Sequence, residues 1–349
     1  MDQLIRTLVD RSSALPTPPA PCYRSARTED AQAHAASLSA WEQHYEQISA
    51  GRFEGQLEDL SLGALQVFRE CSNQSVLQEG QARQGCLTLG LAGFEQGRAS
   101  FCGHRLSADT PIAIQSGVGF QLVTAPGMEL VGISIPIEAL QALAARLDGP
   151  DMQGPLPASC VLRALGPRRQ ALQELSAAAL AIGRDHPARL AEPALARNLV
   201  LAISEAVLAS LRPEHVVGAP PGCAATRERI VRRAREYMQA HAEAVITVPD
   251  LCAAAHTSRR ALQYAFEDLL QLSPISYLRC MRLNRVRREL LRQPAVAVGD
   301  VAARWGFWHL SRFAADYRAL FGELPSATRR RSAGEAPLSR SDNPARAAA

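Results

Sequence analysis

Residues 247–270 have the sequence TVPDLCAAAHTSRRALQYAFEDLL, which predicts two short helices joined by a tight turn. Thr247 is suited to cap the first helix, with Asp250 near the positive end of its dipole. After a break at His256–Thr257, Ser258 caps the second helix. The second helix is expected to bury an apolar face of Ala261, Leu262, Ala265, Phe266 and Leu269. Its opposite face presents hydrogen-bonding side chains, namely Arg259, Arg260, Gln263 and Tyr264. This pattern is typical of a helix-turn-helix.

The pattern occurs a second time in residues 298–321, VGDVAARWGFWHLSRFAADYRALF. Gly306 is expected to end the first helix of this pair, because glycine readily adopts the left-handed conformation found there. The inward positions are Val298, Val301 and Ala302 in the first helix and Phe313, Tyr317, Leu320 and Phe321 in the second. The outward face of the second helix carries His309, Ser311, Arg312 and Ala315. Ser258 and Ser311, 53 residues apart, mark the predicted repeat.

Residues 273–291, SPISYLRCMRLNRVRRELL, predict a long helix that holds the two pairs in a fixed relation. Recognition helices about one DNA turn apart, roughly 34 Å, can enter successive major grooves from one side. Arg can bind guanine through O6 and N7, and Gln can bind adenine. Further arginines are candidates for phosphate contacts, namely Arg279, Arg282, Arg285, Arg287, Arg288, Arg329, Arg330 and Arg331. Trp305 and Trp308 are expected to pack against the helices instead of stacking on DNA.

The charge of the chain is concentrated in the same region. Residues 227–331 carry 19 Arg and 10 acidic residues, a net charge of +9, whereas residues 1–226 carry 17 Arg and 22 acidic residues, a net charge of −5. All basic residues are Arg, which the codon bias of a GC-rich genome explains, but that bias does not explain their uneven placement. The asymmetry indicates a nucleic acid or another polyanion as partner.

These segments resemble the double helix-turn-helix domain of AraC/XylS-type transcription regulators over about 105 residues. The elements that carry the resemblance are Gly306-Phe307, Phe313, Tyr317, Phe321-Gly322 and Pro325-Ser326. By position, the resemblance implies base-reading roles for Arg260, Gln263 and Tyr264 in the first unit and for His309, Ser311 and Arg312, with Ala315, in the second. The family often has a long basic residue where this chain has Ala315, so the first recognition helix is expected to carry more of the specificity. The partners implied are promoter double-stranded DNA and RNA polymerase.

A narrower resemblance links the chain to the ethanolamine-operon subfamily of these regulators. It rests on PDLC at 249–252, RLNRVRREL at 282–290, AWEQHYEQISAGRFEGQL at 40–57 and LQVFRE at 65–70. The resemblance implies an activator that responds to ethanolamine together with a cobalamin cofactor. The chain lacks the D-x-H-x-x-G signature of base-off cobalamin binding, so any cobalamin would be bound in another way.

The N-terminal part is predicted to be a sensor and dimerisation domain over residues 30–212. Short apolar runs separated by Gly and Pro predict antiparallel strands from about 55 to 137. Ala- and Leu-rich segments from about 138 to 212 predict helices, which either cover the strands or form a dimer interface. Such a strand-rich fold favours a small-ligand pocket, for which the candidate lining residues are Trp41, Arg69, Glu70, His104 and Arg105. The effector-binding residues are otherwise unknown.

The remaining segments complete the predicted organisation. Residues 1–29 are expected to be a flexible leader, 213–226 a Pro- and Gly-containing linker, 227–331 the DNA-binding domain and 332–349 a disordered tail. Spacing places Trp41, Tyr45 and Ile48 on one face of a helix expected between Asp30 and Ile48. The predicted class is α+β, with an N-terminal strand-rich, cupin-like or barrel sensor domain that carries helices and a C-terminal all-α double helix-turn-helix domain.

Several functional classes are disfavoured by the sequence. It has no G-x-S-x-G, P-loop or H-E-x-x-H motif, and its eight scattered cysteines form no CxxC or Cys/His cluster, so neither an enzyme nor a metal site is expected. No signal peptide or membrane-spanning stretch is evident, which favours the cytoplasm. The leading hypothesis is a ligand-responsive activator of a catabolic operon, as a homodimer or a monomer. The alternative is a constitutive architectural DNA-binding protein whose N-terminal barrel only dimerises.

Overall fold

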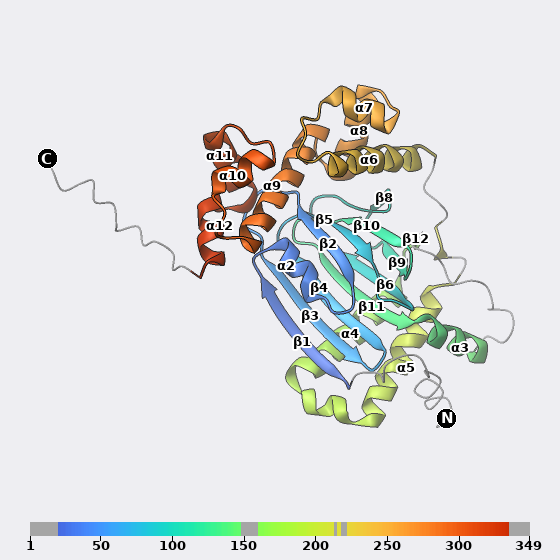
Figure 1. The fold of residues 1–349 in the computed structure, drawn as a ribbon. Coiled ribbons are helices and arrows are strands. Elements are labelled where there is room, and N and C mark those ends of the chain that lie inside the picture. Colours follow the sequence, from blue (N-terminus) through green and yellow to red (C-terminus); the bar gives the residue numbers. More distant parts are fainter. Residues whose placement is uncertain (1–19, 148–159, 213–214, 218–221, 335–349) are drawn as a thin grey trace. The chain divides into compact units, whose positions relative to one another are not determined.

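The computed structural model describes residues 20–147, 160–212, 215–217 and 222–334 of the 349-residue chain. The chain forms two compact units (Figure 1). The sheet unit runs to Tyr45 and continues over Phe53–Glu228, and the helical unit combines Glu46–Arg52 with the chain from Arg229 onward. Most of the predicted leader 1–29 and of the predicted tail 332–349 lies outside the described residues.

Two sheets form the sheet unit. The seven-stranded sheet has the order β1 (Cys22–Thr28), β3 (Gly55–Leu62), β4 (Leu65–Ser72), β11 (Glu129–Pro136), β6 (Cys86–Gly93), β9 (Pro111–Gln115) and β12 (Cys160–Val161). The five-stranded sheet has the order β2 (Glu42–Gln47), β5 (Val76–Gln81), β10 (Gly119–Val123), β7 (Ala99–Phe101) and β8 (His104–Leu106). In the centre of the larger sheet, Gly132 of β11 lies opposite Phe68 of β4 and Gly90 of β6, in antiparallel register. The strand-rich prediction for residues 55–137 is confirmed.

Strand alternation divides the interior into two layers. On β6, Leu87, Leu89 and Leu91 belong to the apolar cluster shared with the helices, whereas Thr88 and Gly90 face the other way, toward the space between the sheets. A second cluster fills that space with residues from both sheets, such as Phe68 and Phe120. The sheets therefore enclose a core of their own.

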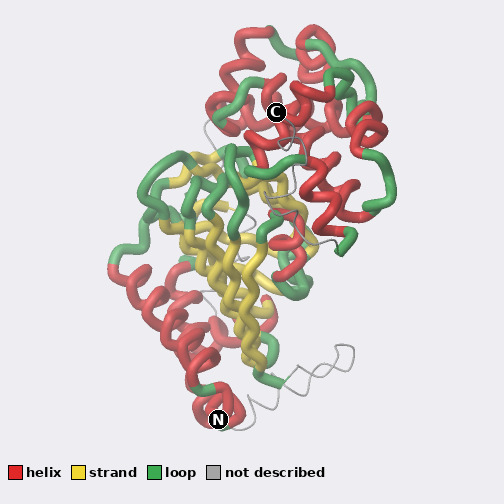
Figure 2. The backbone as a smooth tube through the Cα atoms, turned by 90° about the vertical axis from the view of Figure 1, so that its left-hand side faces the viewer, coloured by secondary structure: helices red, strands yellow, loops and turns green. Residues whose placement is uncertain are grey.

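Three helices cover the face of the seven-stranded sheet that points away from the smaller sheet (Figure 2). They are α3 (Ile137–Leu147), α4 (Pro167–Asp185) and α5 (Pro193–Ser210), and a short 3-10 helix, Pro187–Ala191, joins the last two. Among the described residues, α5 is long and apolar enough to cross a membrane by length and composition alone. Its buried residues Ile203, Val207 and Leu208 pack in the cluster with β3, β4, β6 and β11, as expected of a core helix. A dimer interface on these helices stays a prediction.

The chain before β3 differs from the sequence-based expectation. The predicted helix over Asp30–Ile48 is wrong, because only α2 (Ala31–Ser37) is helical, capped by the Asp30 carboxylate, and Glu42–Gln47 then forms β2. Trp41 and Tyr45 therefore line the space between the sheets instead of one helix face. The predicted leader also contains β1, which pairs with β3 along its whole length. These segments are ordered by pairing with distant strands, which local spacing does not reveal.

Among the described residues, the helical unit contains two helices of 19 residues, α6 and α9, and five shorter ones. They are α6 (Gly222–Ala240, most of which belongs to this unit), α7 (Val248–Ala255), α8 (Arg259–Leu270), α9 (Pro274–Arg292), α10 (Val298–Arg304), α11 (Leu310–Phe321) and α12 (Pro325–Ser332). Helix α9 is the predicted connector, and its Leu283, Val286 and Leu290 pack against residues of α10 and α11. The start of α6 lies inside the segment predicted as a linker, and α12 contains Arg329–Arg331.

Candidate nucleic-acid interface

The two predicted helix-turn-helix motifs share one turn geometry. After α7, His256 adopts the left-handed conformation with φ 49°, and after α10, Gly306 adopts it with φ 80°. In both turns, the N–H of the following residue donates to the carbonyl oxygen five residues earlier, which is the pattern of a Schellman motif. The predicted role of Gly306 as the residue that ends the helix is confirmed, whereas His256 holds the same conformation at a steric cost.

The second helices of the two motifs are equivalent over their whole length. Helices α8 and α11 each have 12 residues and begin 51 residues apart, at Arg259 and Leu310. Each ends at a left-handed residue, Gln271 or Gly322, and a proline opens the helix that follows. The spacing of 53 residues taken from Ser258 and Ser311 is therefore wrong, because the N-cap of α11 is His309 and the second turn is one residue longer than the first.

The outer face of α8 carries the predicted base-reading residues. Ser258 caps the helix by accepting a hydrogen bond from the N–H of Ala261 at 3.2 Å. Arg259, Arg260 and Tyr264 are exposed, the last with 58% of its surface accessible. Gln263 is half-buried and its amide donates to Glu267 at 2.5 Å, so it would have to leave this partner to bind a base. The opposite face is buried through Leu262, Ala265, Phe266 and Leu269, as predicted, while Ala261 is half-buried.

The outer face of α11 carries fewer long polar side chains than the outer face of α8. His309, Ser311, Arg312 and Ala315 are all exposed, and Phe313, Tyr317, Leu320 and Phe321 are buried as predicted. The 51-residue relation pairs Arg260 with Ser311 and Tyr264 with Ala315, so these two long polar side chains of α8 correspond to short ones on α11. Trp308, expected to pack, is instead 74% exposed beside Leu310, which is also exposed. Trp305 packs as expected, and its ring N–H donates to Glu289 at 2.8 Å.

The candidate phosphate-binding arginines fall into two groups. Arg287 is buried, in an ion pair with Glu323 at 2.7 Å, and Arg282 donates from Nε to the Ala242 carbonyl at 3.0 Å and from Nη2 to the Ala244 carbonyl. Burial, and then the charge of Arg285, lower the pKa of Arg282. Arg287 and Arg282 thus have partners inside the protein. The second group has accessible side chains and consists of the half-buried Arg279, Arg285, Arg288, Arg329 and Arg330 and the exposed Arg331. Within it, Arg279 forms an ion pair with Asp316 and Arg331 forms one with Glu323.

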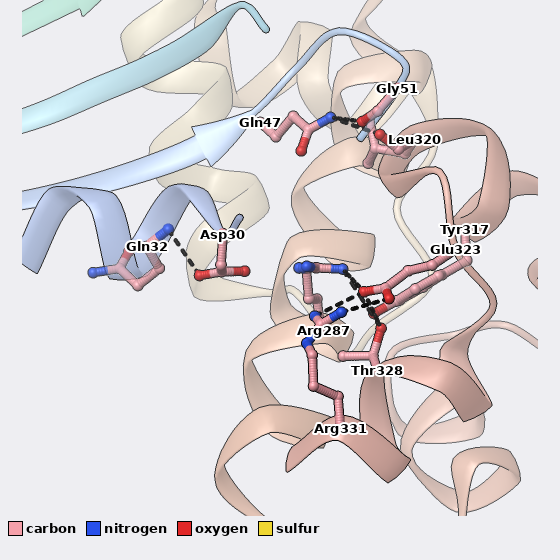
Figure 3. A network of polar contacts seen from close by, with 10 residues as sticks. All are labelled: Asp30, Gln32, Gln47, Gly51, Arg287, Tyr317, Leu320, Glu323, Thr328 and Arg331. Carbon is pink, nitrogen blue, oxygen red and sulfur yellow. Dashed lines mark hydrogen bonds and ion pairs between the residues drawn. The ribbon is translucent and has the colours of Figure 1, made fainter. Parts of the chain in front are cut away.

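A buried polar network holds α12 to α9 and α11 (Figure 3). The Glu323 carboxylate accepts from Arg287 at 2.7 Å, from Thr328 at 2.8 Å and from both terminal nitrogens of Arg331 at 2.7 and 2.9 Å. Burial alone would raise the pKa of Glu323, but its bonds to Arg331 and Thr328 and the charge of Arg287 lower it below the ordinary value. Burial also raises the pKa of Tyr317, which contacts Thr328, to about 12. The network fixes the second recognition helix on its support.

The helical unit also contains a segment from early in the chain, Glu46–Arg52. The Gln47 side-chain amide donates to the carbonyl oxygens of Gly51 and Leu320 at 2.6 Å each (Figure 3). The Tyr277 hydroxyl donates to the Glu46 carboxylate at 2.8 Å and accepts from Arg235 at 2.8 Å. Glu46, Gln47, Arg235 and Tyr277 are all buried. The segment Glu46–Arg52 thereby contacts both α9 and the C-terminal end of α11.

Two structural features of the unit were missed in the sequence. The role of Glu46–Arg52 has no local signal, because it depends on contacts with residues more than 230 positions away. The burial of Arg287 has a weak sequence signal, because Arg287 lies four residues after Leu283 on the apolar side of α9.

Comparisons with known proteins agree on the helical unit. A family model described as a helix-turn-helix domain matches residues 251–331. The chain is 38% identical over 99 residues to a probable thc operon regulatory protein of Rhodococcus erythropolis, covering 28% of this chain and 30% of that protein. It is 36% identical over 104 residues to the XylDLEGF operon transcriptional activator 2 of Pseudomonas putida, covering 29% and 63%. The chain thus spans less than two thirds of either protein's length.

A solved structure of a probable AraC family transcriptional regulator from Rhodopseudomonas palustris CGA009 is 35% identical over 30% of this chain and 96% of that one, with a TM-score of 0.28. Residues 251–331, which the family model matches, contain α8, α9, α10 and α11. The ethanolamine-operon subfamily receives no support from these comparisons. Residues 251–331 are therefore a helix-turn-helix domain similar to those of AraC/XylS-type transcription regulators.

Proposed function

We propose that this protein is a ligand-responsive activator that binds promoter DNA sequence-specifically and acts with RNA polymerase in the cytoplasm. The observation that carries the DNA-binding part is the 51-residue repeat, by which α8 and α11 hold corresponding positions in two helix-turn-helix motifs before and after α9. A net charge of +9 over residues 227–331 suits the phosphate backbone. The relatives described as operon regulators support an operon as the target.

Base reading is assigned mainly to α8. Arg260 offers a guanidinium for guanine, and Gln263 offers an amide for adenine once it leaves Glu267. Ser258, Arg259 and Tyr264 stand beside them, and on α11 His309, Ser311, Arg312 and Ala315 occupy the equivalent surface. Arg285, Arg288, Arg329 and Arg330 are proposed to contact phosphates. Arg282 is the weakest of these candidates because its guanidinium already donates to two carbonyl groups.

The sensing part rests on strand β2. Its Gln43 and Tyr45 line a small space between the two sheets, and its last two residues, Glu46 and Gln47, are buried in the helical unit. A ligand that shifts β2 in the cavity would therefore move residues bonded to Tyr277 and Asn284 of α9. Such a ligand would change the population of conformations that differ in DNA or polymerase engagement.

The size of the cavity limits the effector. Ethanolamine, which the sequence resemblance implies, is the first compound to test. A cobalamin does not fit, because its corrin ring and nucleotide are several times larger than the enclosed space. Glu70 and Trp41 line the cavity as expected, whereas Arg69, His104 and Arg105 are not among its lining residues.

The experiment is a screen of the full-length protein for ligand-dependent change in both melting temperature and promoter output. Ethanolamine, amino acids and polyamines form the panel, and a promoter found by genome-wide mapping of bound sites drives a reporter. A compound that stabilises the protein and changes reporter output supports the proposal. DNA binding and reporter output that no compound changes would favour a constitutive architectural protein, and sedimentation with and without the compound would test homodimerisation.

A further inference from the structure

The turn of the second helix-turn-helix motif contains one residue more than the turn of the first, and that residue is a tryptophan. The first turn places residues 257–258 between its left-handed residue and α8, and the second places residues 307–309 between its left-handed residue and α11. In each turn, the first of these residues donates its N–H to the carbonyl oxygen five residues earlier, and the last is the N-cap of the helix that follows. The extra residue is therefore the middle one, Trp308, which has no counterpart in the first motif.

Trp308 and Leu310 expose large apolar side chains on either side of the N-cap of α11. Their exposed fractions are 74% and 53%, whereas the nearby Trp305 and Phe307 pack against the apolar cluster of α9, α10 and α11. Leu310 reaches only the edge of α10, where its Cδ1 lies 3.9 Å from the position that a Cβ on Gly299 would take. Large apolar groups that remain exposed and are rimmed by polar residues mark a surface that a partner covers.

The position of this apolar surface favours DNA bases as that partner. In helix-turn-helix proteins, the N-terminal residues of the second helix contact base edges in the major groove. The residues around the surface, His309, Ser311 and Arg312, are polar and exposed, and the domain over residues 227–331 has a net charge of +9. An apolar surface at the start of such a helix is therefore suited to an apolar group on a base edge.

The chemistry of α11 at this point is opposite to that of α8. Under the 51-residue relation, Leu310 corresponds to Arg259 and Ser311 to Arg260, so two guanidinium groups of the first motif are replaced by an isobutyl group and a hydroxyl group. Arginine suits guanine, which presents two acceptors in the major groove, whereas thymine presents a 5-methyl group there. The apolar residues of α11 are thus matched to thymine.

We propose that Trp308 and Leu310 recognise thymine in the half-site bound by the second motif, through apolar contact with 5-methyl groups in the major groove. This inference rests on the proposed sequence-specific DNA binding and names the base chemistry that α11 recognises. The two motifs then differ in how they read DNA. Helix α8 uses hydrogen-bonding groups, and α11 uses an apolar surface with Arg312 beside it.

The test removes the methyl groups from the DNA and leaves the protein unchanged. Thymines of a site selected from genome-wide binding are replaced by deoxyuridine, which pairs with adenine in the same way but lacks the 5-methyl group, in one half-site at a time. Anisotropy titration of the full-length protein at one salt concentration measures the affinity. In one half-site, the inference predicts a loss of about fourfold for each methyl group that the protein covers. No variant is needed, so a folding defect cannot obscure the result.

Variants then assign the methyl dependence to the second motif. Trp308→Ser and Leu310→Gln should each weaken binding to the thymine form, and the double variant should bind the thymine and deoxyuridine forms of that half-site equally. Val245→Ser is the matched control, because Val245 is 85% exposed in the loop before α7, outside both recognition helices. It should keep the full difference between the two forms.

The outcomes separate this inference from the proposed function on which it rests. Equal wild-type affinity for both forms of both half-sites, or a methyl dependence that the double variant retains, would overturn the inference and leave sequence-specific DNA binding in place. Variants that bind both forms as the wild type does, yet lower reporter output, would assign the surface to a protein such as RNA polymerase and would also overturn it. If the protein selects no DNA site, the proposed function fails and this inference fails with it.

Discussion

Gln47 and Asn284 form a reciprocal pair of hydrogen bonds in the helical unit. The backbone N–H of Gln47 donates to Oδ1 of Asn284 at 3.1 Å, and Nδ2 of Asn284 donates to the Gln47 carbonyl at 2.9 Å. Both residues are buried, and Asn284 also donates to the Cys280 carbonyl one turn earlier on α9. The side-chain amide of Asn284 thus satisfies both the N–H and the carbonyl group of Gln47. These two bonds hold the segment Glu46–Arg52 in the unit that contains α8 and α11.

Asn284→Leu should therefore destabilise the protein by roughly 2–4 kcal/mol, because it leaves a buried N–H and a buried carbonyl of Gln47 without these partners. Urea unfolding monitored by circular dichroism measures the change. Gln293→Leu, at the exposed end of the same helix, is the control and should change stability by less than about 0.5 kcal/mol. A loss for Asn284→Leu as small as the control's would show that the segment is not held by this pair.

The two left-handed turn residues predict opposite effects of exchange. Gly306→Ala should cost about 1–2 kcal/mol, since φ is 80° and the added Cβ would lie 2.9 Å from Nη1 of Arg282. His256→Gly should be neutral or stabilise the protein by up to about 1 kcal/mol, because it removes the same steric cost at φ 49°. Thermal unfolding of both variants tests this. A stabilising Gly306→Ala would contradict the assigned turn geometry.

The Glu323 network predicts acid sensitivity. Because the folded pKa of Glu323 lies below its unfolded value, the unfolded state binds more protons between the two. The carboxylate thus stabilises the fold fully above its unfolded pKa, and this stabilisation is lost as pH falls through the folded pKa.

Glu323→Gln should be less stable by on the order of 3 kcal/mol near neutral pH, because it leaves the Arg287 charge buried without its carboxylate. This deficit should shrink on acidification. Urea unfolding of wild type, Glu323→Gln and the exposed control Glu243→Gln from about pH 7 to about pH 3 checks it. A Glu323→Gln deficit that stays constant over this range would exclude Glu323 as the source of acid sensitivity.

Arg282 and Arg330 should behave differently although both were phosphate candidates. Arg282→Gln should lower stability by about 2 kcal/mol, since Arg282 donates to the carbonyls of Ala242 and Ala244. Arg330→Gln, on the surface of α12, should leave stability unchanged and reduce the salt slope of DNA binding by about one. Unfolding and salt-dependent DNA titration of both proteins separate the roles. If Arg282→Gln instead left stability unchanged and reduced the salt slope, Arg282 would contact DNA and would not stabilise the fold.

The helical unit could be predicted closely from the sequence because its signals are local. Caps such as Thr247 and Ser258, the left-handed Gly306 and the spacing of Phe313 and Tyr317 lie within one or two helical turns of what they determine. The 51-residue register was missed by two residues, because the serine in α11 lies inside the helix and not at its cap.

The early chain could not be predicted in the same way. Trp41 and Tyr45 have helical spacing, yet Tyr45 lies within β2 and Trp41 directly before it, because β2 is ordered by the sheet that it joins. Glu70 was a candidate for the pocket by residue type alone. Its aromatic neighbours come from β4, β10 and the segment before β2, and only the folded sheets bring them together. Long-range pairing, absent from any local window, decides both cases.

The central claim is that α8 reads bases, and one measurement tests it most directly. The affinity of wild type and Arg260→Ala is compared on a site selected from genome-wide binding and on random DNA of equal length at one salt concentration. The account predicts a loss of about 1–3 kcal/mol on the selected site, with relaxed preference at one base, and little change on random DNA. An equal loss on both DNAs would contradict it, because Arg260 would then contact phosphate and not a base.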